Sequence, residues 1–120
     1  MRGLRLKEPP LIINPKLAAL IGLNEAIILQ QIHYWIENNK RKRLNFKDGF
    51  YWTYNSFESW QEQFPFWNVR TIRRIIDKLR QKELVIVGNY NQMKIDRTLW
   101  YRLDYGKIES LLEGQKVKLS

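Results

Sequence analysis

The stretch "FPFWNVRTIRRIIDKLRQKELVIVGNY", residues 64–90, combines an aromatic turn, a charged helix and a β-prone end. Asn68 is suited to cap a helix that runs to about Lys82. On a helical wheel one face of this helix is apolar, and it consists of Val69, Ile72, Ile75, Ile76 and Leu79. Residues 68–82 also contain four Arg and two Lys against one Asp. The pattern predicts a helix with one side in a core and a strongly cationic opposite side.

A strand and a shorter helix are predicted just before this helix. Residues 50–54, "FYWTY", are aromatic and β-prone, which favours a strand. Asn55 and Glu58 have the spacing of a capping box and predict a helix through about Phe64. Pro65 ends that helix, because proline disfavours helical geometry in the residue before it. A tight turn therefore joins the two helices.

Two strands and a final helix are predicted after the long helix. "LVIVGNY", residues 84–90, and "LWYRLDY", residues 99–105, are β-prone and flank the polar connection "NQMKIDRT". "GKIESLLEG", residues 106–114, is amphipathic and favours a short helix before a polar end.

The N-terminal part is predicted to be an arm followed by two helices. "LIIN", residues 11–14, favours a short strand or extended arm, and Pro15 opens a short helix that Gly22 ends. Asn24 is suited to cap the next helix, whose apolar stripe consists of Ile27, Ile28, Ile32, Trp35 and Ile36. The following "NKRKRLNFKDG", residues 39–49, is interpreted as a polar basic loop.

The order of these elements predicts an α+β fold: a winged helix-turn-helix with a short N-terminal arm and a C-terminal helix. Two helices joined by a tight turn and followed by a β-hairpin define this arrangement, whose second helix enters the major groove of DNA. The predicted organisation is an arm over residues 1–14, one winged-helix domain over residues 15–113 and a polar tail over residues 114–120.

Composition narrows the class of protein. A chain of 120 residues that is 44% hydrophobic forms most simply one domain with a real core. It has no cysteine, no apolar run long enough to span a membrane and no signal peptide, which together indicate a cytoplasmic protein. The net charge of +9 indicates a polyanionic partner, nucleic acid before an anionic membrane.

The long helix carries the residues predicted to read DNA. Arginine side chains can contact guanine or clamp phosphate, while Asn and Thr near a helix start can contact phosphate. The predicted contacts are Asn68, Arg70, Thr71, Arg73, Arg74 and Lys78. The alternative is a solvated basic face that Asp77 partly neutralises by pairing with Arg73 and Arg74.

Two further groups of cations are candidates for backbone contacts. Lys94 and Arg97 lie in the predicted wing and would gain by release of counterions from DNA, unless this is an ordinary polar hairpin tip. The run Lys40, Arg41, Lys42 and Arg43 either grips phosphate or forms a solvated loop.

Other residues are interpreted as structural. The aromatic residues of "FPFW" and alternate members of "YWTY" are expected to pack in the core and not to stack on bases. His33 is the single histidine, and no second His or Cys accompanies it, so no metal site is predicted. No cofactor loop or nucleophile motif is present, and enzyme activity is not expected.

Three stretches together resemble a known family: "IGLNEAIILQQIHYWI", "YNSFESWQEQFPFWNVRTIRRIIDKL" and "GNYNQMKIDRTLWYRLDYGKIE". They resemble the N-terminal winged-helix domain of replication proteins of phages and mobile elements of Gram-positive bacteria, described as replisome organisers or DnaD-like replication initiators. The resemblance covers about residues 11–110. It implies DNA binding during replication initiation, self-association and contact with replication or helicase-loading proteins. By this analogy the reading helix is 68–82 and the wing is 88–98. Such initiators usually continue into a second C-terminal region, whereas this sequence ends in "GQKVKLS".

The leading hypothesis is therefore a non-enzymatic, double-stranded DNA-binding module for phage or plasmid replication, and a homodimer. A winged-helix transcriptional regulator would have the same fold and site. A third reading is a protein-interaction or oligomerisation module of the replisome, for which the aromatic residues could supply an interface.

Overall fold

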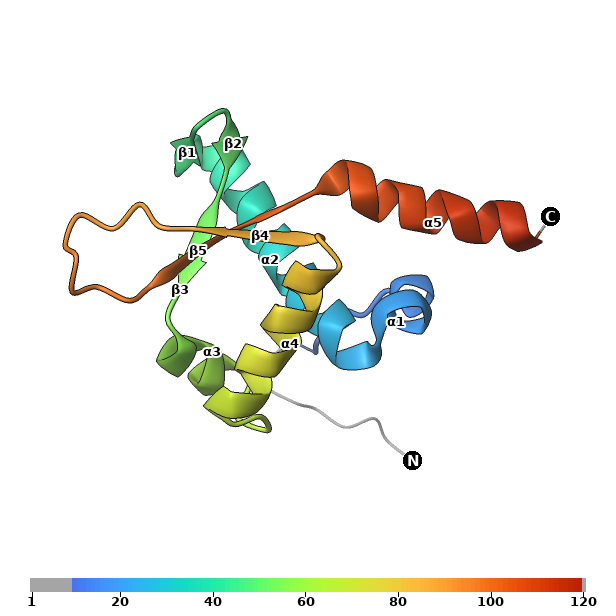
Figure 1. Ribbon diagram of the computed structural model, residues 1–120, viewed down its shortest axis with the longest axis horizontal. Coiled ribbons are helices and arrows are strands. Elements are labelled where there is room, and N and C mark those ends of the chain that lie inside the picture. Colours follow the sequence, from blue (N-terminus) through green and yellow to red (C-terminus); the bar gives the residue numbers. More distant parts are fainter. Residues whose placement is uncertain (1–9, 120) are drawn as a thin grey trace, which may run out of the picture.

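The computed structural model describes residues 10–119 (Figure 1). Most of the predicted N-terminal arm, residues 1–9, thus lies outside the described residues. The part of the arm that is described, residues 10–14, is extended and exposed. Within the described part of the chain, residues 10–14 take part in no strand pairing. Of the two predicted alternatives, a short strand or an extended arm, these residues form the arm.

Two helices open the fold. Helix α1 (Pro15–Ile21) has Pro15 at its start, and the Asn14 side chain accepts a hydrogen bond from the Leu17 amide at 3.1 Å. Gly22 has a φ of 105°, a conformation that favours glycine, and serves at once as the end of α1 and the cap of α2 (Leu23–Lys42). The prediction that Asn24 caps the second helix is therefore wrong.

Helix α2 is longer than the sequence pattern suggested. It continues through Lys42, and Arg43 closes it in the left-handed conformation with φ 56°. The first four residues of the predicted basic loop, 39–42, are thus helical, and the rest of that run is not. Lysine and arginine are good helix formers, and cations near a helix C-terminus interact favourably with the helix dipole.

The predicted strand over residues 50–54 is divided in the structure. Strands β1 (Phe46–Lys47) and β2 (Phe50–Tyr51) form a small antiparallel hairpin, whereas β3 (Thr53–Asn55) pairs with a distant strand. Trp52 separates them: its amide donates to the carbonyl of Asn45, and its indole Nε1 donates to the carbonyl of Lys47. These bonds turn the chain between the two pairings.

Helices α3 (Phe57–Gln63) and α4 (Val69–Gln81) follow, as predicted. The cap of α3 is Ser56, whose Oγ accepts from the Ser59 amide at 3.1 Å, and not Asn55. Asn68 caps α4 as predicted, since its Oδ1 accepts from the Thr71 amide at 2.8 Å.

The remaining strands complete a three-stranded sheet. Strands β4 (Val85–Gly88) and β5 (Leu99–Leu103) are antiparallel, and β5 lies in the centre of the order β3-β5-β4. Residues 89–98 form a long loop between β4 and β5 that projects from the body (Figure 1).

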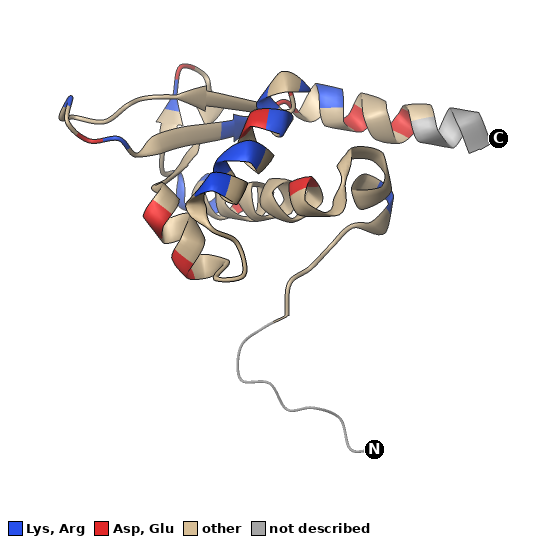
Figure 2. Ribbon diagram, turned by 60° about the horizontal axis from the view of Figure 1, so that its bottom comes forward, with Lys and Arg blue, Asp and Glu red and all other residues tan. Residues whose placement is uncertain are grey.

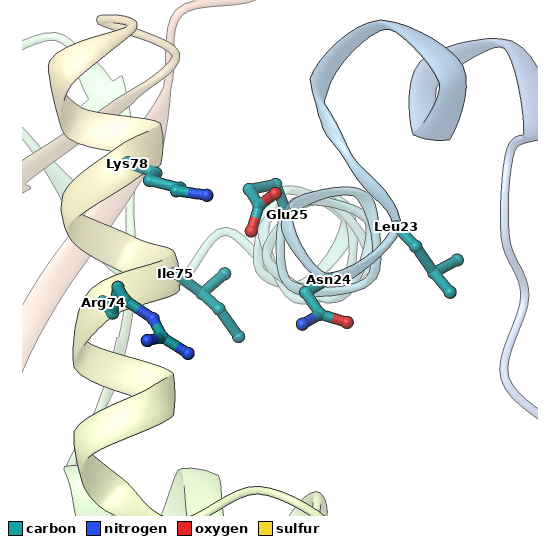
Figure 3. Close-up of a pocket in the computed structure, with 6 residues that line it drawn as sticks. All are labelled: Leu23, Asn24, Glu25, Arg74, Ile75 and Lys78. Carbon is teal, nitrogen blue, oxygen red and sulfur yellow. The ribbon is translucent and has the colours of Figure 1, made fainter.

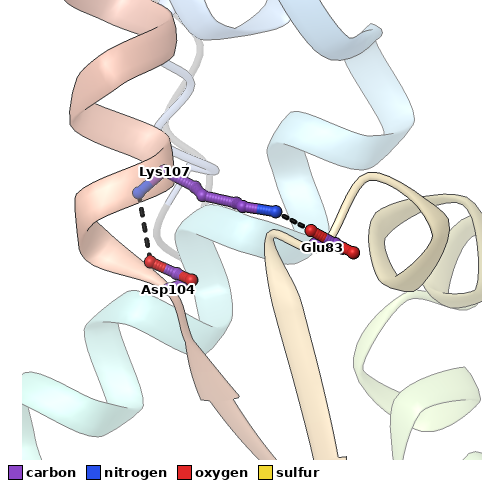
Figure 4. Close-up of polar contacts among 3 residues, drawn as sticks. All are labelled: Glu83, Asp104 and Lys107. Carbon is purple, nitrogen blue, oxygen red and sulfur yellow. Dashed lines mark hydrogen bonds and ion pairs between the residues drawn. The ribbon is translucent and has the colours of Figure 1, made fainter.

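Helix α5 (Tyr105–Leu119) leaves the end of β5 and is longer than predicted, since it covers most of the expected polar tail. Asp104 fixes its start, because the carboxylate accepts from the Lys107 amide at 3.1 Å (Figure 4). The Lys107 side chain pairs with Glu83, which links α5 to the turn after α4.

The main core lies between the helices and one face of the sheet. Apolar side chains from α2, α3, α4 and β5 fill it, with Ile28, Ile32, Trp60, Ile72, Leu79 and Tyr101 fully buried. The period of these residues along α4 and α2 explains why the helices were predictable.

A second apolar layer, here called the outer aromatic layer, consists of Trp52, Tyr90 and Trp100. Both tryptophans are buried but do not belong to the main core. The Tyr90 ring lies 5.0 Å from Trp52 and 5.4 Å from Trp100, between ring centroids. Since Trp100 alternates with the core residue Tyr101 along β5, this layer covers the other face of the sheet.

The described residues thus form one α+β fold with five helices and two small antiparallel sheets. The order helix, strand, helix, turn, helix, strand, loop, strand is compatible with a winged-helix arrangement.

Candidate nucleic-acid interface

Helix α4 separates its apolar and charged residues completely. Ile72, Ile75, Ile76 and Leu79 are buried, with exposed fractions of 0–2%. Arg70, Arg73, Arg74 and Lys78, here called the basic face of α4, are all exposed. Figure 2 shows the basic positions along the ribbon of this helix, with an acidic position among them. The four predicted cations on this helix are therefore available to a ligand.

The two predicted polar contacts at the helix start are less free. The Oδ1 of Asn68 is already used to cap the Thr71 amide, and Thr71 itself is half-buried. Asn68 is exposed, so its amide NH₂ group can still face a ligand beside the helix start.

The basic face forms no ion pair with the acidic residues that the structure describes. Within the residues that the structure describes, no carboxylate lies within 4.0 Å of a cation of α4. Within the described residues Asp77 therefore forms no ion pair with Arg73 or Arg74, whereas the alternative itself, a solvated basic face, stays a prediction. The Arg73 guanidinium instead lies over the ring of Phe57 in α3, 4.3 Å from the ring centroid.

Arg73 and Arg97 line the same groove. This groove, with a volume of about 490 Å³, is formed by the starts of α3 and α4 and by the end of the 89–98 loop; its walls include Ser56, Glu58, Val69 and Thr98. The structure thus places one cation of α4 and one cation of the predicted wing in the wall of one groove, together with the acidic residues Glu58 and Asp96.

A second hollow, of about 360 Å³, lies beside the other end of the basic face (Figure 3). Arg74 and Lys78 line it from α4, and Asn24 and Glu25 line it from the first turn of α2. Glu25 is 8% exposed and folds back over Gly22, where an added Cβ would overlap its carboxylate. An acidic group thus borders the basic face, a feature that the sequence pattern did not reveal.

The side chain of Asn91 cross-links the 89–98 loop. Its Nδ2 donates to the carbonyls of Asp96 at 3.0 Å and Thr98 at 2.7 Å, and its Oδ1 accepts from the indole Nε1 of Trp100 at 2.8 Å. The Thr98 amide donates to the Asp96 carboxylate, which lowers the pKa of Asp96. Sequence reasoning missed Asn91, because its partners lie up to nine residues away.

The predicted wing cations stand at different places on this loop. Lys94 is exposed at the tip, and Arg97 is exposed near the base, beside the groove with Arg73. Figure 2 shows the loop extending from the same body as α4, with a basic residue at its end.

The run from Lys40 to Arg43 lies elsewhere. These residues end α2, whereas the hollow beside Arg74 contacts the first turn of the same helix. At about 1.5 Å per residue the two places are roughly 25 Å apart along α2. All four cations are exposed, but the structure does not join them to the basic face of α4.

The aromatic residues divide between core and surface. Phe64 is buried as predicted, but Phe66 is exposed, and among residues 50–54 the buried side chains are Trp52 and Thr53. Phe50 and Tyr54 are exposed, so of the alternate residues 50, 52 and 54 only Trp52 is buried. The guanidinium of Arg102, from β5, lies 3.7 Å from the centroid of the Phe50 ring. Arg102 is a half-buried cation that sequence reasoning did not select.

The described residues show no arrangement suited to a metal site or to a membrane span. His33 Nδ1 lies 2.9 Å from the hydroxyl of Tyr105, a structural link between α2 and α5. Across residues 10–119 no group of three or more His, Asp or Glu side chains is placed to hold a metal ion. In the same range no helix is both long enough and apolar enough to cross a membrane.

Comparison with protein families, with curated proteins and with solved structures gives no match to this chain.

Proposed function

We propose that this protein is a non-enzymatic module with a winged-helix fold that binds double-stranded DNA during initiation of phage or plasmid replication. The observation that carries the proposal is the basic face of α4. It presents four exposed cations that have no carboxylate partner among the described residues, directly opposite an apolar stripe that is buried in the core.

In this proposal α4 enters the major groove, where helices of this kind contact base edges. Arg70 and Arg74 stand on the exposed first turns and can contact guanine through two hydrogen bonds. Arg73 and Arg97, which line one groove together with Glu58 and Asp96, are proposed to contact phosphates from the helix and from the loop. Lys94 reaches further along the DNA backbone.

The role in replication rests on the resemblance of three sequence stretches to replisome organisers and DnaD-like initiators. That role implies a homodimer that contacts replication or helicase-loading proteins in the cytoplasm, where the DNA is. The chemistry of the basic face supports DNA binding, and the resemblance alone supports the replication context.

Salt-dependent binding to duplex DNA tests the proposal. If about five to eight phosphates are neutralised per protomer, log K plotted against log salt should fall with a slope of about −5 to −7. A mobility shift on random duplex at several salt concentrations measures this slope. A slope near zero would show that the net charge of +9 serves no DNA contact.

Selection of bound sequences from a random duplex library tests the biological context. Enrichment of one motif that lies near a replication origin supports the replication role. Enrichment of promoter sequences would instead favour a transcriptional regulator.

An interaction module of the replisome is a second candidate, and one observation favours it. Leu11, Ile12 and Ile13 are exposed apolar side chains in a row, on a segment that pairs with no described strand. A protein that self-associates but gives no shift on duplex DNA at low salt would fit this candidate.

A further inference from the structure

The tip of the 89–98 loop carries two exposed apolar side chains around a cation. Ile95 is 80% exposed, the largest exposed fraction among the big apolar side chains that the structure describes, and Met93 is 66% exposed. Lys94 stands between them and is also exposed. Single exposed apolar residues are ordinary on protein surfaces, but two such residues on one exposed turn form a small apolar surface.

The tip is presented on an ordered support. The Asp96 amide donates to the carbonyl of Met93 at 3.1 Å, which closes a turn with Lys94 and Ile95 at its centre. Behind this turn the Asn91 side chain ties the two arms of the loop and anchors them to Trp100. The apolar side chains therefore stand at the end of a braced projection (Figure 1).

The tip is also continuous with the basic face of α4. Arg97, two residues beyond Ile95, shares a groove with Arg73. In the proposed complex, with α4 in the major groove, the loop that borders the start of α4 faces the adjacent backbone and its tip the neighbouring minor groove. Phosphate contact requires cations only, whereas apolar side chains gain by contact with sugars and base edges in the minor groove.

We propose that Ile95 and Met93 form an apolar wedge that enters the DNA minor groove and partly unstacks one base step. Lys94 holds the neighbouring phosphate, so that the wedge and the cation act on adjacent parts of one strand. This proposal rests on the proposed DNA-binding function and adds to it a deformation of the duplex, which helical readers of the major groove do not by themselves require.

Fluorescence of 2-aminopurine, which rises when the base loses its stacking partners, tests the wedge. The base is placed at each position in turn across and beside the selected site, and a second duplex with fluorophores at both ends reports bending. We expect the wild-type protein to raise the fluorescence at one step beside the site and to shorten the end-to-end distance.

The double variant Met93→Ala with Ile95→Ala should lose both signals and bind about three- to tenfold more weakly. Its thermal midpoint should stay close to the wild-type value, because both side chains are exposed. Lys94→Ala should weaken binding but keep the fluorescence signal, and Gln92→Ala, an exposed neighbour, should change neither.

The following results would contradict the proposed wedge. Wild-type binding without a fluorescence change at any position, or a double variant that retains the change, contradicts it while DNA binding itself stands. A double variant with unchanged DNA signals and a lower mass in sedimentation would assign the tip to a contact between protein chains. A wild-type protein that binds no duplex removes the proposed function as well.

Discussion

The guanidinium carbon of Arg73 lies 4.3 Å from the centroid of the Phe57 ring, so a cation of α4 rests on an aromatic ring of α3. Such an attraction contributes about 0.5–1 kcal/mol at an exposed site. It also restricts the orientation of the Arg73 side chain, which lines the same groove as Arg97. Arg73 is therefore held in position before a ligand arrives, which lowers the entropy cost of binding.

Phe57→Leu should weaken DNA binding about threefold, because Arg73 would then have to be ordered on binding. The free energy of unfolding should fall by about 1 kcal/mol, since Phe57 also packs against the core. The control is the same substitution in an Arg73→Ala background, where DNA affinity should no longer respond to it. Equal losses of affinity in both backgrounds would contradict this role.

Substitutions in α4 and in the loop should affect DNA binding in different ways. Arg70→Ala or Arg74→Ala should cost about 1–3 kcal/mol on the preferred site and much less on random duplex. Lys94→Ala or Arg97→Ala should weaken binding to both DNAs equally and lower the salt slope by about one. Binding titrations on the two duplexes measure both effects. A uniform loss in all four variants would make α4 a phosphate clamp that does not read bases.

Asn91→Ala should destabilise the 89–98 loop by about 2–3 kcal/mol. The change leaves two carbonyls without their donor and the indole N–H of Trp100, which is 8% exposed, without its acceptor. Thermal unfolding measures the loss. Asn89→Ala, which removes only an acceptor for the Asn91 amide on an exposed residue, should cost less than about 1 kcal/mol. Similar losses in the two variants would show that the Asn91 bonds do not hold the loop.

Stability should fall at alkaline pH because burial raises the pKa of Tyr101 to about 12. The unfolded chain releases this proton near pH 10. The stabilisation is therefore complete below pH 10 and is lost as the pH rises toward 12, by up to about 3 kcal/mol. Denaturant titrations at pH 9, 10.5 and 12 measure this loss.

Tyr101→Phe is the control for the alkaline effect. It should be less stable at neutral pH by about 1 kcal/mol, because Trp60 Nε1 loses the hydroxyl that accepts its hydrogen bond. It should nevertheless lose less stability than the wild type between pH 10 and 12. An identical loss in both proteins would assign the alkaline effect to other groups.

Self-association should depend on the apolar segment before α1. Ile12→Asp places a charge on a side chain that is 76% exposed, so it should leave folding intact and shift a dimer toward monomer. Sedimentation at micromolar concentration measures the mass. Met93→Ser, at another exposed apolar side chain, is the matched control and should remain dimeric. An unchanged mass for Ile12→Asp would remove this segment from the interface.

Much of the fold follows from local patterns. The apolar period of Ile72, Ile75, Ile76 and Leu79 predicted α4. A capping-box spacing predicted α3, and two β-prone stretches predicted β4 and β5. The failures occurred where bonds or charges outside the apolar pattern decide. The predicted strand 50–54 is divided because the backbone amide and the indole N–H of Trp52 both donate to carbonyls of the preceding chain. Helix α2 extends because cations near its C-terminus interact favourably with the helix dipole.

The candidate site was predictable only as a set of exposed cations. Helical geometry placed Arg70, Arg73 and Arg74 opposite the core. The sequence could not indicate that Phe57 holds Arg73, or that Glu25 borders Arg74, because these partners come from other helices. Such contacts depend on how the helices pack, which no local period encodes.

The separation of Trp52 and Trp100 from the main core has a consequence for how the molecule opens. The bonds that join the 89–98 loop to the β1–β2 hairpin, such as that from the Tyr90 hydroxyl to Asp48, belong to the outer aromatic layer. A fluctuation can break this layer while Trp60 and its neighbours stay packed. Backbone amides near residues 46–51 and 89–98 should therefore exchange with solvent deuterium as one group, at a lower opening free energy than the amides of α2 and α4.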